Sequence, residues 1–447
     1  MVNDSKQTPK VPSNGKDNGS RGRTEEESQT SSRRALLKTT GVVGTVGLAG
    51  CLGSGSGGGG PSGPVKIGVL APEPSKNPIG GSIANGAKLA AKQLNQNGGV
   101  LGKNVKVIVK DTKEDPSTGK SKYQELTVGE SVDFTTGIFT SEVLLNAMDS
   151  IAQQQTVHMG TGAATPEATT KVKHDYEKYK YFFRTGPVNS HYLGTNMVDF
   201  AKSQFDSMGW NSVAVLAEDY TWTKPVTSVL ENKLSDTGVD VPITKRYASG
   251  TKNFSSIYDD IESAGVDATY VVMAHTGTAA VVQWKKQQRQ FEFGGIHVPM
   301  QFPSYYGSVD GACRYALTQN SATPNAKVTK KTVPFTNSYE KEYGKYPVYT
   351  GYITFDAVKQ YAAAAKSADS RKAKKVIPKL ESSTYTGTTG TLKYYGKNET
   401  YPHDVVYGKD AVWPIWLQWQ ENSGSGVQQA VWPSDVATGS YKKPPWI

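Results

Sequence analysis

Short apolar segments alternate with amphipathic ones along most of this 447-residue chain, and this alternation constrains the fold more than any other feature. Residues 65–71 (Val-Lys-Ile-Gly-Val-Leu-Ala) form a compact apolar run typical of a buried strand. Residues 82–95 then place Ile83, Ala87 and Leu94 on one helical face. Repeated strand–helix alternation of this kind predicts a parallel sheet covered by helices on both faces.

The alternation occurs twice, which predicts two α/β lobes of similar size. About 380 residues follow residue 64, too many for a single core. In the first unit we expect strands at 65–71, 105–110, 132–139 and 156–159, and helices at 82–95, 120–128 and 143–154. In the second we expect helices at 192–208, 225–234, 254–264 and 279–288, and strands at 212–217, 240–247, 269–273 and 297–302. A late helix at 352–365 and hairpin strands within 384–419, with Gly387 and Gly390 at a turn, complete the pattern.

The first 64 residues are typical of an export signal and a tether. Arg33-Arg34 matches a twin-arginine signal, and the apolar stretch that follows is too short to span a bilayer. Leu48-Ala49-Gly50-Cys51 resembles a lipobox, in which the cysteine is lipidated. We therefore expect a twin-arginine lipoprotein signal over 1–50 and a Gly/Ser-rich tether over 51–64. This predicts an exported protein held by lipid on the outer face of the cytoplasmic membrane, at the cell surface or in the periplasm. A disordered tail with a chance Arg-Arg pair is the alternative, and the order of the signals disfavours it.

The charge distribution argues against a nucleic-acid partner, and the cysteine content argues against a disulfide. The net charge of +10 includes eight Lys/Arg and five Asp/Glu in residues 1–50, which leaves 42 minus 35, or +7, for the rest. The lysines are scattered among acids without the basic stripe of a nucleic-acid binder, so no nucleic-acid partner is expected. With Cys51 assigned to the anchor, Cys313 has no partner for a disulfide and is expected to be buried.

Catalytic motifs are scarce, and the sequence predicts no enzyme, no cofactor and no metal site. Gly80 to Gly86 lacks the Lys-Ser/Thr of a phosphate-binding loop, and the chain has no Gly-x-Ser-x-Gly nucleophile elbow. Ser117 to Lys120 fits Ser-x-x-Lys without its companion motifs and is interpreted as a helix start. The six histidines show no metal-ligand spacing.

The candidate binding residues follow the predicted strands, because open α/β sheets bind ligands at the carboxyl ends of their strands. Ser141 lies where a strand ends and a helix begins, so its hydroxyl and the free backbone N–H groups suit a carboxylate; a simple N-cap is the alternative. The loop from Gly160 to Pro166 has small residues that let a ligand approach the backbone. Tyr220 and Trp222 follow the strand at 212–217, where they either close over a ligand or pack between the lobes.

From residue 65 to about 419 the chain resembles the solute-binding proteins of ABC transporters, of the branched-chain amino-acid (Leu/Ile/Val) type. Residues 67–70 with 86–102 resemble the opening strand and helix of that family. Asp111, Asp115-Pro116 and the loop 160–166 follow in order. The late helices and closing strands are matched by Phe335, Tyr339, Tyr343-Gly344, Pro347, residues 355–358 and residues 387–390.

The resemblance implies a type I periplasmic-binding-protein fold, in which two Rossmann-like lobes are joined by three hinge strands. We place the crossings near 185, 331 and 384, which gives one lobe of 65–185 plus 332–383 and another of 186–331 plus 384–447. Ser141, Ala163 and Thr165 then fall where the family holds the carboxylate and amino groups of an amino acid. Trp222 falls at the aromatic position of the second lobe; Tyr220 and Phe302 are also expected to contact ligand.

Two departures leave the ligand open. Ile79 stands where the family often has an aromatic residue, and Gln301 begins a stretch where amino-acid binders usually place an acid for the ammonium. Glu142, Glu218 or Asp219 could substitute for that acid. Otherwise the ligand is an amide, a carboxylate without an amine, or an aromatic compound.

The expected function is capture of a small solute (an amino acid, an amide or a related organic acid) for uptake through an ABC-transporter permease, by a monomer anchored through lipid. A sensory module that serves a signalling partner is the alternative, and an exported hydrolase is a weaker one.

Overall fold

The computed structural model describes residues 63–447; the predicted export signal and Cys51 lie outside the described residues. Five parallel strands form the first sheet, in the order β2-β1-β3-β4-β5. They are β1 (Val65–Ala71), β2 (Val105–Asp111), β3 (Phe134–Gly137), β4 (Val157–Gly160) and β5 (Phe182–Arg184). In register, Ile67 of β1 lies opposite Val107 of β2 and Phe134 of β3. The four strands expected in this region are confirmed, and β5 is an addition.

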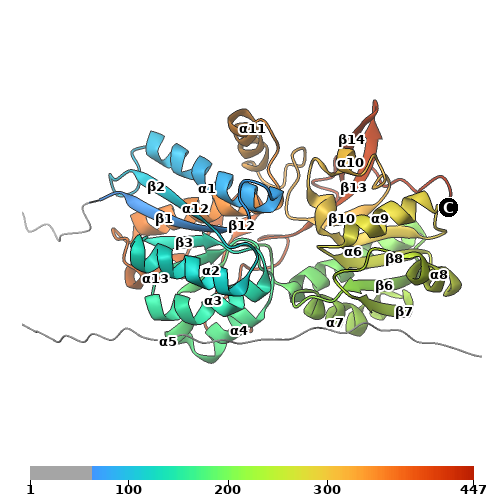
Figure 1. The fold of residues 1–447 in the computed structure, drawn as a ribbon, viewed down its shortest axis with the longest axis horizontal. Helices are drawn as coiled ribbons and strands as arrows, with labels where there is room; N and C mark the ends of the chain where they lie inside the picture. Colours follow the sequence, from blue (N-terminus) through green and yellow to red (C-terminus); the bar gives the residue numbers. More distant parts are fainter. Residues whose placement is uncertain (1–62) are drawn as a thin grey trace, which may run out of the picture. The chain divides into compact units, whose positions relative to one another are not determined.

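Helices cover both faces of the first sheet, with α1 above it and α2 and α3 below it in Figure 1. The segment 78–179 contributes α1 (Pro78–Gln96), α2 (Pro116–Gln124), the π-helical turn η1 (Glu125–Gly129), α3 (Ser141–Gln154), α4 (Glu167–His174) and α5 (Tyr176–Tyr179). Three more come from far along the chain: α11 (Thr332–Tyr343), α12 (Tyr349–Ser367) and α13 (Ala373–Glu381). Their buried side chains belong to the same core cluster as β1–β5.

Helix α1 begins four residues before the predicted start at 82. The Asn77 side chain accepts a hydrogen bond from the Ile79 N–H at 2.9 Å, and Pro78 occupies the first turn, where its missing N–H costs nothing. Farther along α1, a Cβ on Gly86 would lie 2.4 Å from the carbonyl oxygen of Gly351 in α12. The close approach of these two helices therefore requires glycine at position 86.

A second parallel sheet, in the order β7-β6-β8-β9, follows in the chain. Its strands are β6 (Ser212–Glu218), β7 (Asp240–Tyr247), β8 (Ala268–Met273) and β9 (Glu292–His297). The helices of this region are α6 (Ser190–Met208), α7 (Thr223–Lys233), α8 (Ser255–Ser263), α9 (Gly277–Lys286) and α10 (Tyr305–Ser308), with short 3₁₀ turns η2 (Ser235–Thr237) and η3 (Val298–Gln301). Together the two sheets confirm the expected α/β fold class.

The strand expected at 297–302 is wrong, because strand β9 ends at His297 and residues 298–301 form the 3₁₀ turn η3. Gly294 and Gly295 interrupt the apolar pattern of β9, so the periodicity of the sequence does not predict this strand. A Cβ on Gly294 would meet the Trp210 ring at 2.8 Å, and Gly295 has φ +140°. The turn at η3 is stabilised by the His297 ring nitrogen, which accepts from the Met300 N–H at 3.1 Å.

Antiparallel strands complete the C-terminal part. β10 (Leu317–Asn320), β13 (Ile415–Asn422) and β14 (Ser425–Trp432) form a three-stranded sheet in the order β10-β13-β14. β11 (Tyr385–Thr386) and β12 (Thr391–Leu392) form a small hairpin, and Gly387 and Gly390 lie in its turn as expected. The β13–β14 hairpin lies largely beyond the region where strands were expected.

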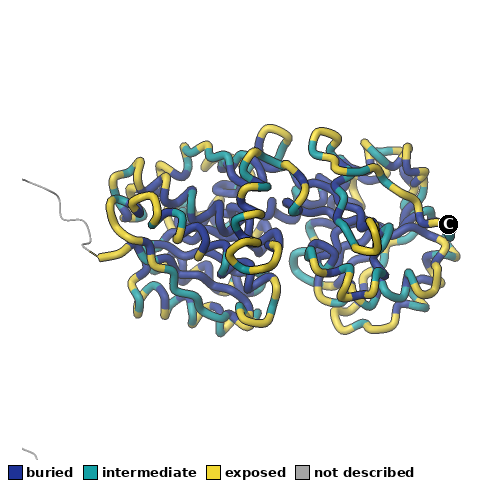
Figure 2. Tube along the Cα trace, turned by 90° about the horizontal axis from the view of Figure 1, so that it is seen from above, coloured by how far each residue is buried: buried dark blue, intermediate teal, exposed yellow. Residues whose placement is uncertain are grey.

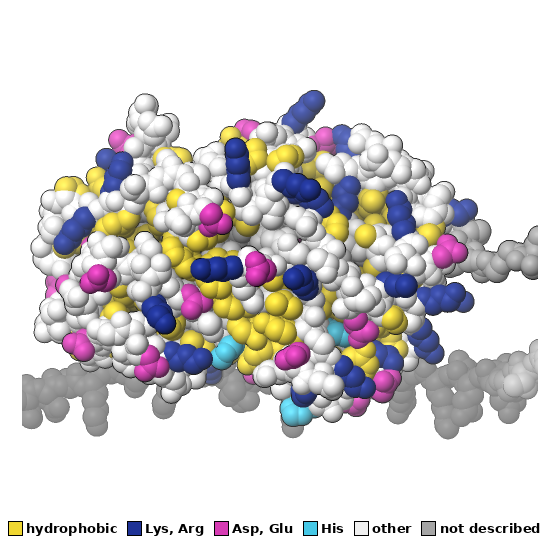
Figure 3. Space-filling view, turned by 180° about the vertical axis from the view of Figure 1, so that it is seen from behind, with side chains coloured by type: hydrophobic (Ala, Val, Ile, Leu, Met, Phe, Trp, Pro, Cys, Tyr) yellow, Lys and Arg dark blue, Asp and Glu magenta, His cyan; other side chains and the backbone are white. Residues whose placement is uncertain are grey.

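Exposed residues lie along the outside of the tube and buried residues inside it (Figure 2). The inner strands β1, β3, β6 and β8 are buried almost throughout. Cys313 is fully buried, as expected, and burial raises the pKa of its thiol. On the face shown in Figure 3, Lys/Arg and Asp/Glu side chains are interspersed, which is the pattern of a solvated surface. Within residues 63–447, none of the helices combines the length and apolar character that a membrane crossing needs.

Candidate functional site

A pocket that is partly open to solvent is lined by residues that follow strands of both parallel sheets. From the first sheet come Phe139, Thr140, Ser141, Glu142, Gly162 and Ala164, and from the second come Tyr220, Trp222, Ala274 and His275. The rest of the lining includes residues in and next to β9, η3 and β10, and Tyr349 at the start of α12. This location, at the carboxyl ends of parallel strands, is the one that the topology predicts.

The N-terminus of α3 forms one end of the pocket. The first N–H groups of a helix lack intrahelical partners and carry partial positive charge, which favours an anion. The Ser141 hydroxyl oxygen accepts from the Thr165 N–H at 3.3 Å, so its own proton is free to be donated. The Thr140 hydroxyl is buried and has no hydrogen-bond partner within the described chain. These groups suit a carboxylate.

Ala163 and Thr165, two of the predicted contacts, are buried in the loop after β4 and do not line the pocket themselves. Their carbonyl oxygens both accept from the guanidinium of Arg184. Arg184 also pairs with Asp404 at 2.8 Å, and both side chains are fully buried. The structure thus reveals a support for this loop that the sequence did not indicate, because Asp404 lies 220 positions away in the chain.

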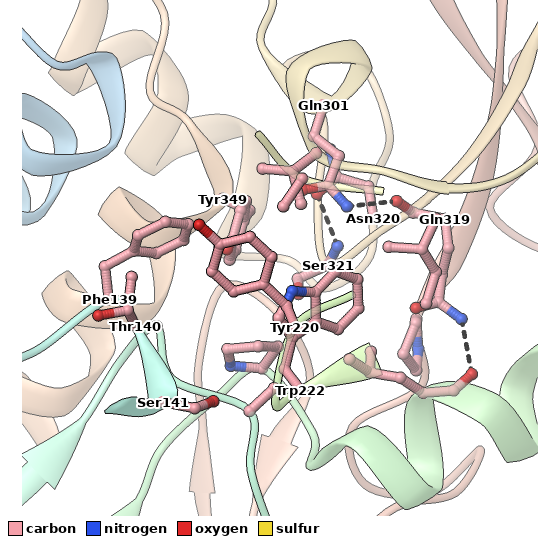
Figure 4. A pocket seen from close by; sticks show the side chains of 18 of the residues that line it. Phe139, Thr140, Ser141, Tyr220, Trp222, Gln301, Gln319, Asn320, Ser321 and Tyr349 are labelled. Atoms are coloured by element: carbon pink, nitrogen blue, oxygen red, sulfur yellow. Dashed lines mark hydrogen bonds between the residues drawn. The ribbon is translucent and has the colours of Figure 1, made fainter. Parts of the chain in front are cut away.

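Aromatic side chains that follow strands of the second sheet form the middle of the pocket. Tyr220 stacks on the His275 ring with centroids 4.3 Å apart, and Trp222 packs against the core clusters of both sheets. Figure 4 shows these two side chains between the Phe139–Ser141 end and the Gln301–Asn320 end. Phe302, also predicted to contact ligand, instead lines an adjoining hollow that shares Phe139, Ala274, His275 and Val298 with the main pocket.

The three acids considered as ammonium partners lie in different surroundings. Glu142 lines the pocket. Glu218 is fully buried, and its Oε2 accepts from the backbone N–H groups of Ala274 and His275 at 2.7 and 2.8 Å. Asp219 is exposed and pairs with Arg246 at 3.2 Å. Of the three, only Glu142 is placed to meet a ligand.

His275 links the two halves of the site by charge. Its Nε2 lies 3.7 Å from Glu114, in the segment after β2, and its Nδ1 lies 3.7 Å from Glu218, at the end of β6. Burial opposes protonation of His275, but the two carboxylates outweigh it and raise the pKa to about 9. His275 is therefore a cation at neutral pH. Sequence reasoning missed it, because a lone histidine carries no spacing signal.

Side-chain amides form the end of the pocket opposite α3. Gln301 of η3, and Gln319 and Asn320 of β10, line it there. The Gln319 amide donates to the Leu193 carbonyl at 3.2 Å and to the Asn196 side chain at 2.7 Å. The sequence singled out the stretch that begins at Gln301 only because an acid was missing. As regards metals, residues 63–447 contain no group of three or more His, Cys, Asp or Glu side chains that could hold an ion.

Comparison with known proteins agrees with this architecture. A family model described as "Periplasmic binding protein" matches residues 64–408. The Leu/Ile/Val-binding protein homolog 1 of Brucella abortus (strain 2308) is 23% identical over 350 residues, which cover 77% of this chain and 90% of that protein.

Two solved structures show the same fold. One is the branched-chain amino acid transporter substrate binding protein LivJ from Streptococcus pneumoniae in complex with isoleucine (TM-score 0.68, 17% identity, 83% of this chain and 100% of that one). The other is a solute binding protein of an ABC transporter from Rhodopseudomonas palustris BisB5 in complex with 3,4-dihydroxybenzoic acid (TM-score 0.68, 18% identity, 85% and 98%). With the family model matching well over half of its length, this chain belongs to the periplasmic binding protein family.

Proposed function

We propose that the protein captures a small organic solute in the pocket between its two parallel sheets and presents it to an ABC-transporter permease. The observation that carries this proposal is the pocket itself, whose walls come from the strand ends of both sheets. The ligands in the structures of similar proteins, isoleucine and 3,4-dihydroxybenzoic acid, support a small solute with a carboxylate.

The carboxylate of the solute binds at the N-terminus of α3, where Ser141 donates a hydrogen bond and the helix end supplies favourable partial charge. The loop that contains Ala163 and Thr165 supports this end, because Arg184 holds both of their carbonyl groups. The body of the solute lies against Tyr220 and Trp222, which contribute apolar contact area from the second half.

Binding closes two lobes around the solute, with no chemistry on it. The lobes are 65–185 plus 332–383 and 186–331 plus 384–447, and the chain crosses between them near 185, 331 and 384. A few residues at such crossings are enough to absorb the backbone change of hinge closure. The closed form is the signal that the permease recognises.

Anchoring keeps the protein near its permease. Cys51 carries the lipid, and residues 51–64 serve as a flexible tether after the twin-arginine signal. In the native host, Cys51→Ser should move the protein from the membrane fraction to the soluble exported fraction, while Cys313→Ser should leave it at the membrane. Retention of the Cys51→Ser protein at the membrane would contradict the anchor.

A thermal-shift panel of amino acids, amides, and aliphatic and aromatic carboxylates tests the binding function. A ligand at a hundredfold excess over its Kd stabilises the folded state by about 2.7 kcal/mol, so one chemical class should raise the melting temperature clearly. Deletion of the protein in the native host should then impair uptake of the same compound. A panel in which no compound shifts the melting temperature would contradict the proposal.

A further inference from the structure

Two buried side-chain amides at the end of the pocket opposite α3 each have one atom without a hydrogen-bond partner. Gln301 is 8% exposed and Asn320 is 3% exposed. The Oε1 of Gln301 and the Nδ2 of Asn320 have no partner anywhere in residues 63–447. A buried polar atom without a partner costs roughly 1–3 kcal/mol, so such atoms in a binding pocket point to a ligand group that satisfies them.

The orientation of each amide is fixed by its other atom. Gln301 donates from Nε2 to the carbonyl oxygen of Gln319 at 2.8 Å, so its free atom is the oxygen, an acceptor. Asn320 accepts at Oδ1 from the Ser321 N–H at 2.8 Å, so its free atom is the nitrogen, a donor. Turning either amide over would place two donors or two acceptors against each other.

The two free atoms belong to one subsite. Gln301 is bonded to the backbone of Gln319, the residue directly before Asn320, and Figure 4 shows both side chains at the same end of the pocket. The pocket residues of the segment 296–321 are all uncharged: Ile296, Val298, Gln301, Gln319, Asn320 and Ser321. The charged groups of the pocket lie elsewhere, Glu142 on α3 and His275 between Glu114 and Glu218.

We infer that this end of the pocket recognises an uncharged ligand group that both donates and accepts a hydrogen bond, a carboxamide or a hydroxyl. The inference rests on the proposed function and names the part of the solute that lies far from its carboxylate. A second carboxylate has no proton for the Gln301 oxygen, and an ammonium has no lone pair for the Asn320 amide. A methyl group satisfies neither atom, and either charge would lack a countercharge there.

Two sets of matched compounds test this subsite by titration calorimetry with the full chain. In the first set, benzoates carry a carboxamide, a hydroxyl, a carboxylate or a methyl group at the 4-position. In the second, glutamine, glutamate, ornithine and norleucine vary the end of an amino-acid side chain. In the set that binds, the carboxamide or hydroxyl compound should bind at least about tenfold tighter than the charged and methyl compounds. In the benzoate set, comparison of the carboxamide with the hydroxyl compound shows which of these two groups the subsite prefers.

Two variants test whether the side-chain amides of Gln301 and Asn320 cause this preference. Asn320→Asp replaces the free donor by an acceptor, and Gln301→Met removes the free acceptor at similar size. Each should weaken the preferred compound by about 10- to 100-fold and leave the methyl analogue within a few-fold. Asn232→Asp on the exposed face of α7 makes the same chemical change away from the pocket and should alter nothing. Circular dichroism and the melting temperature without ligand verify that each variant folds.

The outcomes separate the two claims. Binding of charged or methyl compounds as tightly as their neutral polar partners would overturn the inference and leave the proposed function standing. Unchanged discrimination in both folded variants would do the same. If neither these eight compounds nor any compound of the thermal-shift panel binds, the proposed function is contradicted, and the inference fails with it.

Discussion

At the scale of single residues, a substitution of Trp222 tests whether the aromatic middle of the pocket binds ligand. Its ring lines the pocket, so Trp222→Ala should weaken ligand binding at least about tenfold through lost apolar contact. Because Trp222 is only partly buried, the free energy of unfolding should fall by only about 1 kcal/mol. Titration calorimetry and urea unfolding measure the two effects. Trp446→Ala, near the C-terminus, is the matched control, and equal affinities of all three proteins would remove Trp222 from the site.

Ser141 tests the carboxylate end. Ser141→Ala removes the hydroxyl that is free to donate, so carboxylate ligands should lose about tenfold or more in affinity, and their uncharged amide analogues should lose less. Ser150→Ala, a buried serine in the same helix, controls for changes in α3. Equal losses for charged and neutral ligands would show that Ser141 does not hold the carboxylate.

A substitution of Asp404 tests whether the buried Arg184–Asp404 pair stabilises the loop that contains Ala163 and Thr165. Besides pairing with Arg184, it accepts from Asn189 at 2.8 Å and from Thr169 at 3.1 Å. Asp404→Ala leaves the buried Arg184 charge without its partner and should lower the free energy of unfolding by about 3–5 kcal/mol. Asp260→Ala breaks an exposed pair with Lys245 and should cost less than about 1 kcal/mol. Similar urea midpoints for the two variants would contradict this assignment.

At the scale of structural elements, His275 connects the segment after β8 with the segment after β2. The pKa of about 9 lies above the ordinary value of 6.5, so the stabilisation from the charged His275 is complete below about pH 6.5 and is lost as the pH rises through about 9. Ligand affinity and melting temperature of the wild type should therefore fall between about pH 8 and pH 10.

Tyr220, stacked on His275, and the two carboxylates are the groups that face it. Because other groups also titrate in this range, the informative quantity is the difference between wild type and His275→Gln. The variant should lack the His275-dependent part of the decline. Superimposable pH profiles for the two proteins would show that His275 does not bridge the halves.

The elements themselves were largely predictable, because most strands and helices of this fold carry a clear periodicity. Strand β1 was expected at its observed bounds, and helices such as α6 within two residues. Strand β9 was missed because its glycines fit against Trp210 and β8, a packing requirement that leaves no apolar pattern. The site shows the same contrast. Ser141, Tyr220 and Trp222 follow strands and were expected. His275 also follows a strand, β8, but a lone histidine carried no further signal. Asn320 joins the pocket from β10, through contacts between distant segments.

At the scale of the whole molecule, a pocket formed from both parallel sheets is the functional centre of the described residues. The lipid anchor at Cys51 lies outside them and stays a proposal. The fold class followed from the alternation of strands and helices. The three crossings and the lobe boundaries stay predictions that rest on the family resemblance. Closure about these crossings should decrease the radius of gyration in small-angle scattering when a ligand is added, and an unchanged radius with bound ligand would contradict closure.

The central claim is that one small solute binds in the pocket between the two sheets. The most direct measurement is a calorimetric titration of the compound that gives the largest thermal shift, with the wild type and the Ser141→Ala/Trp222→Ala double variant. The account predicts saturable binding of one molecule per chain to the wild type and a loss of about a hundredfold or more in the folded double variant. Binding that persists unchanged in the double variant, or a stoichiometry other than one, would contradict it.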